Sequence, residues 1–255
     1  MIHVRRGPPP GDFGKRAKAL RGRFRAARTK NPQIAAAVFW NSIRRSLRED
    51  ARELARRFHF KCAYCESRMR HVSHPHIEHY RPKCQERFED LMFDWGNWLL
   101  SCGACNDKKW AEFPEREGAP LLLDPTVDEP QDHVRFRRNL VFPLSDRGKE
   151  TIRLVCLWRR DLEKERGLWL LQIDTLLLLA AHSQDDDVLR ASRDALLWSM
   201  QVEAPYAAMT RQYLAEVCPK FANPAVPHPI IVDENMQQRI ADLVVKHQST
   251  ACRLT

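Results

Sequence analysis

Apolar residues recur at helical spacing between residues 31 and 57. The positions that fall near one face of a helix are Ala36, Trp40, Ile43, Leu47 and Leu54. Asn31 is suited to cap such a helix, and Pro32 suits its first turn, where a missing N–H costs nothing. The segment 31–57 therefore predicts one basic amphipathic helix. Its other positions carry arginines that point at solvent or at nucleic acid: Arg44, Arg45, Arg48, Arg52, Arg56 and Arg57.

From about residue 149 onward the hydrophobic pattern is helical. The expected helices span 149–158, 159–181, 186–200, 204–217 and 234–247, with a proline-rich linker from Pro224 to Pro229 before the last. The apolar stretch Trp169–Ala181 contains Gln172 and Asp174 and is too short to span a bilayer, so it predicts a buried helix. We expect residues 149–255 to form a helical C-terminal domain that offers a docking surface to a partner protein.

The connecting segment 126–148 has a strand pattern. Residues 133–144 predict a short hairpin that turns near Arg138 and Asn139. The chain has 255 residues, of which 44% are hydrophobic, and this is enough for a folded core. The sequence thus favours a mainly α protein with a small β component.

Basic residues are concentrated at the N-terminus of a chain whose net charge is +9. Residues 1–30 contain one acid, Asp12, and ten basic residues: Arg5, Arg6, Lys15, Arg16, Lys18, Arg21, Arg23, Arg25, Arg28 and Lys30. We interpret this segment as a basic arm, since such a cluster attracts polyanions by counterion release. A solvated basic tail without a ligand is the alternative.

Two CxxC pairs predict a structural metal site. No secretory signal is visible, so we expect a cytoplasmic protein without a membrane segment, in which thiols stay reduced. Cys62 and Cys65 precede Cys102 and Cys105, and 36 residues separate the pairs. Two such pairs complete a closed tetrahedral four-thiolate zinc site, which stabilises a small irregular region by about 10 kcal/mol.

A redox role for these pairs is disfavoured. A redox CxxC lies near a thioredoxin-like βαβ pattern, which this sequence lacks. The remaining cysteines have no partner pattern and are interpreted as ordinary thiols: Cys84, Cys156, Cys218 and Cys252.

Polar residues typical of phosphodiester chemistry lie between and just after the two cysteine pairs. They occur in His76–Lys83, in Trp95–Leu100 and in Cys105–Lys109. These segments resemble the HNH endonuclease superfamily. The resemblance implies that Glu78 is a carboxylate metal ligand, His79 the general base, Asn97 the residue that fixes the loop and orients the base, and Asn106 the second metal ligand. Asn106 stands where the superfamily name has its last His, which makes this an HNN variant.

The residue types fit that chemistry. A neutral imidazole such as that of His79 can accept a proton from water at pH 7, an effect of about 10²–10⁴ in rate. The oxygen ligands of Glu78 and Asn106 suit Mg²⁺ or Mn²⁺, and two protein ligands imply one catalytic metal.

Several basic residues lie near this constellation. Arg81, Lys83, Lys108 and Lys109 are candidates for contacts to nucleic-acid phosphates, with a merely solvated basic face as the alternative. Neighbouring histidines, among them His59, His71, His74 and His76, are interpreted as surface or supporting residues, and Glu66 as structural.

A narrower resemblance extends over about residues 58–136. Cys62–Glu66, Ile77–Lys83, Ser101–Asn106 and Leu121–Pro125 occur in that order. They resemble the PtuB-like HNH proteins associated with retrons and with the Septu antiphage system. Asn97-Trp98 departs from the Asn-Leu common in that family, and Asp124 and His133, at family-like positions, are interpreted as structural.

This resemblance implies a ββα-metal nuclease core over 58–125 with helical parts on both sides. It also implies a nucleic-acid substrate, with DNA favoured, and an SMC/ABC-type ATPase as partner. Two alternatives stay open: a non-catalytic zinc-binding nucleic-acid adaptor, and a stand-alone restriction-type or homing-type nuclease.

Overall fold

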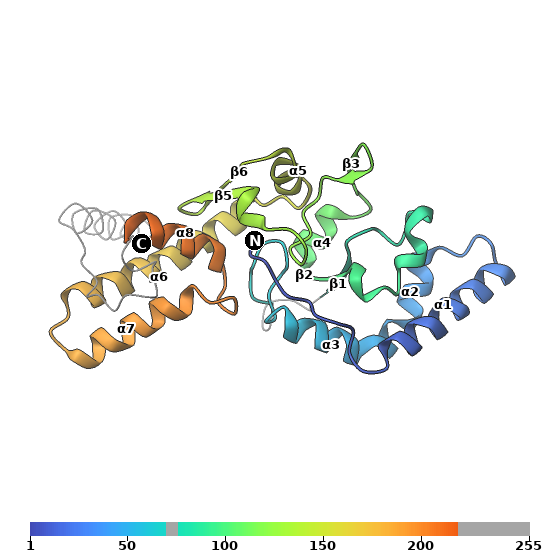
Figure 1. The fold of residues 1–255 in the computed structure, drawn as a ribbon, viewed down its shortest axis with the longest axis horizontal. Coiled ribbons are helices and arrows are strands. Elements are labelled where there is room, and N and C mark those ends of the chain that lie inside the picture. The colour runs from blue at the N-terminus through green and yellow to red at the C-terminus, as the bar shows by residue number, and fades with distance from the viewer. Residues whose placement is uncertain (70–75, 219–255) are drawn as a thin grey trace, which may run out of the picture. The chain divides into compact units, whose positions relative to one another are not determined.

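The computed structural model describes residues 1–69 and 76–218, which divide into two compact units (Figure 1). The first unit contains Met1–Arg135 and Val141–Arg159, and the second contains Phe136–Leu140 and the chain from Arg160 onward. The helix expected at 234–247, the Pro224–Pro229 linker, Cys252, His71 and His74 lie outside the described residues.

The basic N-terminal segment is folded. Helix α1 (Phe13–Lys30) buries a stripe at helical spacing that consists of Phe13, Ala17, Leu20 and Phe24. Met1, Ile2 and Val4 are buried as well. Residues 13–30 therefore form a helix that apolar residues pack onto its unit, and the attraction of this basic segment for polyanions stays a prediction.

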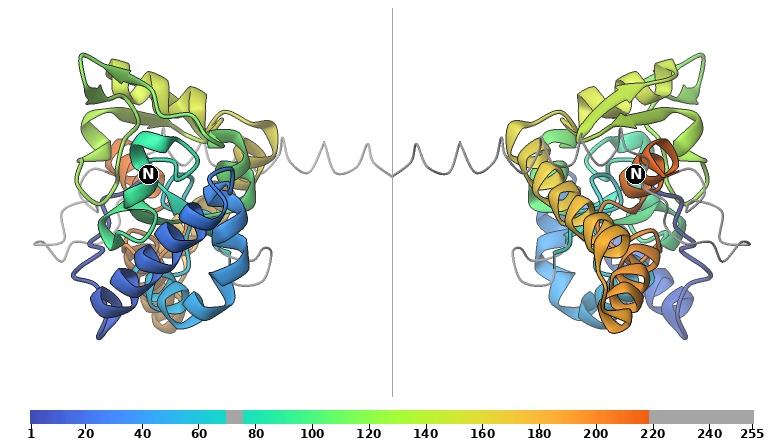
Figure 2. Two further views of the ribbon diagram at one scale, coloured as in Figure 1. Left: turned by 90° about the vertical axis from the view of Figure 1, so that its right-hand side faces the viewer. Right: turned by 90° about the vertical axis from the view of Figure 1, so that its left-hand side faces the viewer.

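The single helix expected over 31–57 is divided into three segments. These are α2 (Ala36–Ile43), a 3₁₀ turn (Arg44–Leu47) and α3 (Arg48–Arg57). Asn31 ends α1 instead of capping the next helix, and its side chain accepts a hydrogen bond from the Gln33 backbone at 3.1 Å. The chain turns here so that α1 lies beside α2, where the rings of Phe24 and Phe39 are 5.1 Å apart (Figure 2).

The burial predicted for this segment is confirmed. The apolar set of the expected helix is buried throughout: Ala36, Trp40, Ile43, Leu47 and Leu54. Trp40 contacts Trp98 with ring centroids 5.7 Å apart, which places α2 against the central strands. The N-terminal helices thus provide one wall of the core of the first unit.

Two strands and a short helix lie at the centre of the first unit. β1 (His76–His79) pairs antiparallel with β2 (Trp98–Ser101), with His79 opposite Trp98. All four residues of β2 are buried. Helix α4 (Gly103–Lys109) follows directly. Two 3₁₀ turns, Glu86–Leu91 and Trp95–Asn97, form part of the connection between the strands.

The rest of the first unit is built from short elements. β3 (Glu115–Arg116) pairs with β4 (Ala119–Pro120), and a 3₁₀ turn (Pro130–Asp132) follows. The predicted hairpin is confirmed as β5 (Val134–Arg137) and β6 (Leu140–Pro143), of which Phe136–Leu140 belong to the second unit. Helix α5 (Asp146–Leu154), capped by Ser145, belongs to the first unit, although we expected it in the C-terminal domain.

The second unit is helical. α6 (Arg160–His182) and α7 (Asp186–Ser199) lie side by side, and α8 (Ala207–Val217) follows (Figures 1 and 2). Asp174, which interrupts the apolar stretch of α6, is buried and accepts a hydrogen bond from the Tyr213 hydroxyl. Among the described residues, no helix has both the length and the apolar character needed to cross a membrane.

Candidate functional site

The four predicted cysteines come together in the first unit. Cys62 and Cys65 lie in the turn before β1, and Cys102 and Cys105 lie at the start of α4. Their sulfur atoms all lie within 4.8 Å of one another, and Cys65 Sγ is 3.8 Å from Cys102 Sγ. Zn–S bonds of about 2.3 Å in a tetrahedron imply S–S edges of about 3.8 Å. The four sulfur atoms can therefore hold a metal ion such as zinc.

An arginine distant in sequence lies against this cysteine group. Arg159 Nη1 is 3.6 Å from Cys105 Sγ and also donates to the backbone carbonyl of Cys156 at 3.2 Å. Burial acts against the charge of Arg159, but the thiolate charges of Cys105 and Cys65 outweigh it and raise the pKa of Arg159. Sequence reasoning missed this residue, because no spacing pattern connects positions 54 apart.

A buried lysine balances the negative charge of Glu78. Lys109 Nζ lies 2.6 Å from Glu78 Oε1 and donates to the backbone carbonyl of His79 at 3.0 Å. Lys109 is fully buried and Glu78 is 4% exposed. Burial raises the pKa of Glu78, and the charge of Lys109 opposes that rise. Lys109 thus faces the interior, so the expected contact between Lys109 and a nucleic-acid phosphate is wrong.

One ring nitrogen of His79 makes a hydrogen bond, and the other has no hydrogen-bond partner among the described residues. Nε2 lies 3.0 Å from the Met92 carbonyl, an acceptor, so the proton of a neutral imidazole sits on Nε2. Nδ1 is buried and, among the described residues, has no hydrogen-bond partner. Burial, with the charge of Lys83 second, lowers the pKa of His79 well below 6.5. The ring is therefore neutral at pH 7, with its lone pair on Nδ1.

An aromatic side chain covers this imidazole. The Trp40 ring meets His79 edge-on with centroids 4.6 Å apart, and Lys83 Nζ lies 5.6 Å from the Trp40 ring centroid. His79 is only 3% exposed. Trp40 on α2 was predicted as a core residue, and the structure adds that it packs on the candidate base.

Asn97 connects the residues just after β1 to the 3₁₀ turn Glu86–Leu91. Its Oδ1 accepts from the Arg81 backbone N–H at 2.7 Å, and its Nδ2 donates to the carbonyls of Arg81 at 2.9 Å and Leu91 at 3.2 Å. The side chain is buried, so these bonds are shielded from water. Asn97 therefore fixes the backbone just after His79.

A tyrosine hydroxyl near Glu78 was not singled out from the sequence. Tyr64, between Cys62 and Cys65, is fully buried, and its hydroxyl has no hydrogen-bond partner among the described residues. Burial, followed by the charge of Glu78, raises the pKa of Tyr64 well above its usual value. Buried polar atoms without partners are rare in proteins, which sets this hydroxyl apart from most of the core.

The other predicted residues lie on more open parts of the same unit. Asn106 is half-buried on α4, and Lys108 is exposed. The Arg81 guanidinium lies over the rings of Tyr80 and Phe113, at 5.6 and 5.4 Å. Lys83 is partly buried, and burial lowers its pKa. Arg81 and Lys83 are thus held by aromatic rings beside the candidate base.

The structural interpretations of three further residues agree with their contacts. Asp124 is buried and accepts from the Thr126 backbone at 2.9 Å, and His133 Nδ1 lies 2.7 Å from the Ser145 hydroxyl. Glu66 pairs with the Met1 amino group at 2.7 Å. Each makes contacts that hold the fold.

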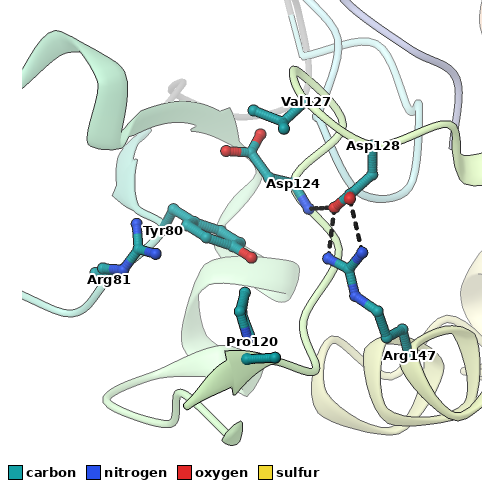
Figure 3. Close-up of a pocket in the computed structure, with 8 residues that line it drawn as sticks. Tyr80, Arg81, Pro120, Asp124, Val127, Asp128 and Arg147 are labelled. Atoms are coloured by element: carbon teal, nitrogen blue, oxygen red, sulfur yellow. Dashed lines mark hydrogen bonds and ion pairs between the residues drawn. The ribbon is translucent and has the colours of Figure 1, made fainter.

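A pocket of about 290 Å³ is lined by Tyr80, Arg81, Asp124, Asp128 and Arg147, among others (Figure 3). Arg147 joins Asp128 there with two hydrogen bonds of 2.7 and 2.6 Å, and the Tyr80 hydroxyl donates to the Leu122 carbonyl at 2.7 Å. These contacts hold the segment 122–128 against Tyr80 and α5.

The fold and site define a mainly helical protein in which four cysteines that can hold a metal ion lie in the same unit as a buried set of ionisable residues. In sequence, the chain is similar to two curated proteins named Septu protein PtuB. The one from Bacillus mycoides (strain KBAB4) is 30% identical over 53% of this chain and 59% of the relative. The one from Bacillus thuringiensis is 32% identical over 40% of this chain and 38% of the relative.

The chain thus spans less than two thirds of the length of these relatives. No protein-family model matches the chain. No solved structure matches it significantly.

Proposed function

We propose that this protein is a metal-dependent nuclease of the HNH type that hydrolyses phosphodiester bonds in nucleic acid, with DNA as the favoured substrate. The observation that supports this most directly is the state of His79. The imidazole of His79, which follows the buried Glu78 in β1, is neutral and keeps its lone pair on Nδ1, and a general base needs such a lone pair. Water attack on phosphorus would deliver its proton to Nδ1.

The protein holds that base in one orientation. Met92 accepts the Nε2 proton and so fixes the tautomer, while Asn97 fixes the backbone after the strand. Burial, together with the positive charge of Lys83, lowers the pKa of His79 and keeps the imidazole unprotonated. Such a base is already unprotonated at neutral pH and can accept a proton from water directly.

Glu78 and Asn106 are the residues that would hold Mg²⁺ or Mn²⁺. The Lys109 ammonium now lies 2.6 Å from the Glu78 carboxylate, so a metal would take over part of the charge balance that Lys109 provides. When bound, the metal would stabilise the charge on the phosphoryl and leaving oxygens. Lys83 and Arg81 would contact substrate phosphates, and zinc at the four cysteines would stabilise the turns that carry Tyr64 and Asn106.

We further propose an antiphage defence role in which the nuclease acts with an SMC/ABC-type ATPase. The similarity to proteins named Septu protein PtuB supports this role, and the sequence resemblance supports the ATPase partner. A stand-alone nuclease would need no such partner, so dependence of cleavage on the ATPase distinguishes the two.

A zinc-binding nucleic-acid adaptor is the second candidate function. The low exposure of Glu78 and His79, at 4% and 3%, favours it, because a reacting phosphate needs access to both. In an adaptor, the Glu78–Lys109 pair would be only structural.

Cleavage assays decide between these functions. Zinc-loaded protein is incubated with plasmid, single-stranded DNA and RNA in Mg²⁺ or Mn²⁺, with and without a candidate SMC/ABC-type ATPase from the same genome. We expect cleavage by the parent, a loss of at least about 100-fold in His79→Ala, and unchanged cleavage by His182→Ala, a control at an exposed histidine at the end of α6. Equal cleavage by folded His79→Ala and parent would contradict the assigned base, and binding without cleavage would support the adaptor.

A further inference from the structure

Trp110, immediately after α4, is held in an unusual and exposed position. It is 78% exposed, the largest exposed fraction among the large hydrophobic residues that the structure describes. Its backbone has φ 47° and ψ −121°. The Glu112 N–H donates to the Lys109 carbonyl at 3.0 Å, so Trp110 is the second residue of a type II′ turn. That position favours glycine, and a tryptophan there is strained.

The backbone around Trp110 is fixed on both sides. Lys109 is buried against Glu78, and the Trp110 N–H donates to the Asn106 carbonyl at 2.9 Å. The Ala111 carbonyl accepts from Gln85 Nε2 at 2.6 Å, and Glu112 pairs with Arg153 at 3.0 Å. The indole is therefore presented to solvent from a constrained turn, one helical turn beyond Asn106.

We propose that Trp110 is a stacking platform for an unpaired nucleobase of the substrate. The inference rests on the proposed function, in which Asn106 and Glu78 lie at the scissile phosphate. A base attached to a nucleotide beside that phosphate would be within reach of a ring one helical turn away. Aromatic side chains bind single-stranded nucleic acid by stacking, and they do so without sequence preference.

The surroundings of Trp110 favour a nucleobase over a protein partner. The nearby positions in the chain are charged and exposed: Asp107, Lys108 and Glu112. The centre of a protein interface is depleted of charged residues, whereas one base needs only a single flat ring. Lys108 adds a cation for a neighbouring phosphate, and Arg153 offsets the charge of Glu112.

The test measures binding in a His79→Ala background, which prevents cleavage, with any required ATPase present. Trp110→Gly removes the ring and suits the turn, so this variant is expected to fold at least as well as the parent. Trp110→Phe keeps an aromatic ring. Trp158→Ala is the matched control, since Trp158 is also exposed, at 55%. The probes are fluorescent single-stranded DNA, the same strand with abasic sites, and duplex DNA.

We expect Trp110→Gly to bind single-stranded DNA about 5- to 150-fold more weakly than the background, with a much smaller effect in Trp110→Phe and none in Trp158→Ala. The difference between Trp110→Gly and the background should vanish on the abasic strand and be smaller on duplex DNA.

Equal binding of single-stranded DNA by the background and Trp110→Gly would overturn the stacking role while leaving the nuclease proposal intact. If Trp110→Gly instead lost only the binding of the ATPase, Trp110 would belong to a protein interface, and the stacking role would be overturned. Absence of both binding and cleavage in the otherwise unmodified protein would overturn the proposed function and this inference together.

Discussion

Replacing Lys109 with methionine tests whether the buried Glu78–Lys109 pair is held together by charge. Methionine has nearly the same length and volume, so the change removes the ammonium and leaves little cavity. Both side chains are at most 5% exposed and their charged atoms are 2.6 Å apart. Breaking one side of such a pair leaves an uncompensated buried charge, which costs about 3–5 kcal/mol. We therefore expect Lys109→Met to lower the free energy of unfolding by that amount.

A double-mutant cycle measures the interaction itself. Urea denaturation at fixed zinc concentration is carried out on the parent, Lys109→Met, Glu78→Gln and the double variant. With a slope of about 2–3 kcal/mol per molar urea, Lys109→Met should shift the midpoint down by about 1–2 M. In the Glu78→Gln background the same substitution should cost little or even stabilise the protein, because it then removes a buried ammonium that has lost its carboxylate partner.

The penalty should also depend on pH. Burial raises the pKa of Glu78 above its ordinary value of 4.5, and Lys109 holds it down. A carboxyl with a raised folded-state pKa stabilises the fold below its ordinary pKa, and this contribution is lost as pH rises through the folded value. Without Lys109 that folded pKa rises further, so Glu78 can take up a proton instead of remaining a bare charge.

The Lys109→Met penalty should consequently be smaller near pH 5 than near pH 8. Additive effects in the cycle, within about 0.5 kcal/mol, together with a penalty independent of pH, would refute the claim that the pair is coupled by charge.

Three further outcomes are expected. Cys102→Ser should lose bound zinc, measured by elemental analysis, together with much of the near-ultraviolet circular dichroism, whereas His79→Ala should keep both. Because the pKa of His79 lies well below 6.5, cleavage should persist below that pH. Lys83→Met should raise the pKa of His79 and so shift the acid limb of the pH–rate profile to higher pH. An unmoved limb would show that the charge of Lys83 does not help to lower the pKa of His79. Arg159→Met should weaken zinc binding about 10- to 100-fold in competition with a chromogenic chelator, while the exposed neighbour Arg160→Met should not.

The sequence by itself determined the features that depend on short-range spacing. Two residues in a CxxC turn face one point, so the four cysteines could be predicted as one site from their positions alone. The stripe from Ala36 to Leu54 and the turn at Arg138-Asn139 likewise follow from helical and strand periodicity, and both are confirmed. Helix α1, by contrast, was not predicted, because its apolar stripe is interrupted by many lysines and arginines.

Only the tertiary structure decided the environment of each polar group. Lys109 and Lys108 are adjacent lysines on one short helix, yet one is buried against Glu78 and the other is exposed. The side of His79 that bears the lone pair is set by the Met92 carbonyl, and Arg159 reaches Cys105 across 54 positions. Burial and charge partners arise from contacts between distant segments, so residue type and local spacing do not encode them, and these contacts set the pKa and the role of each group.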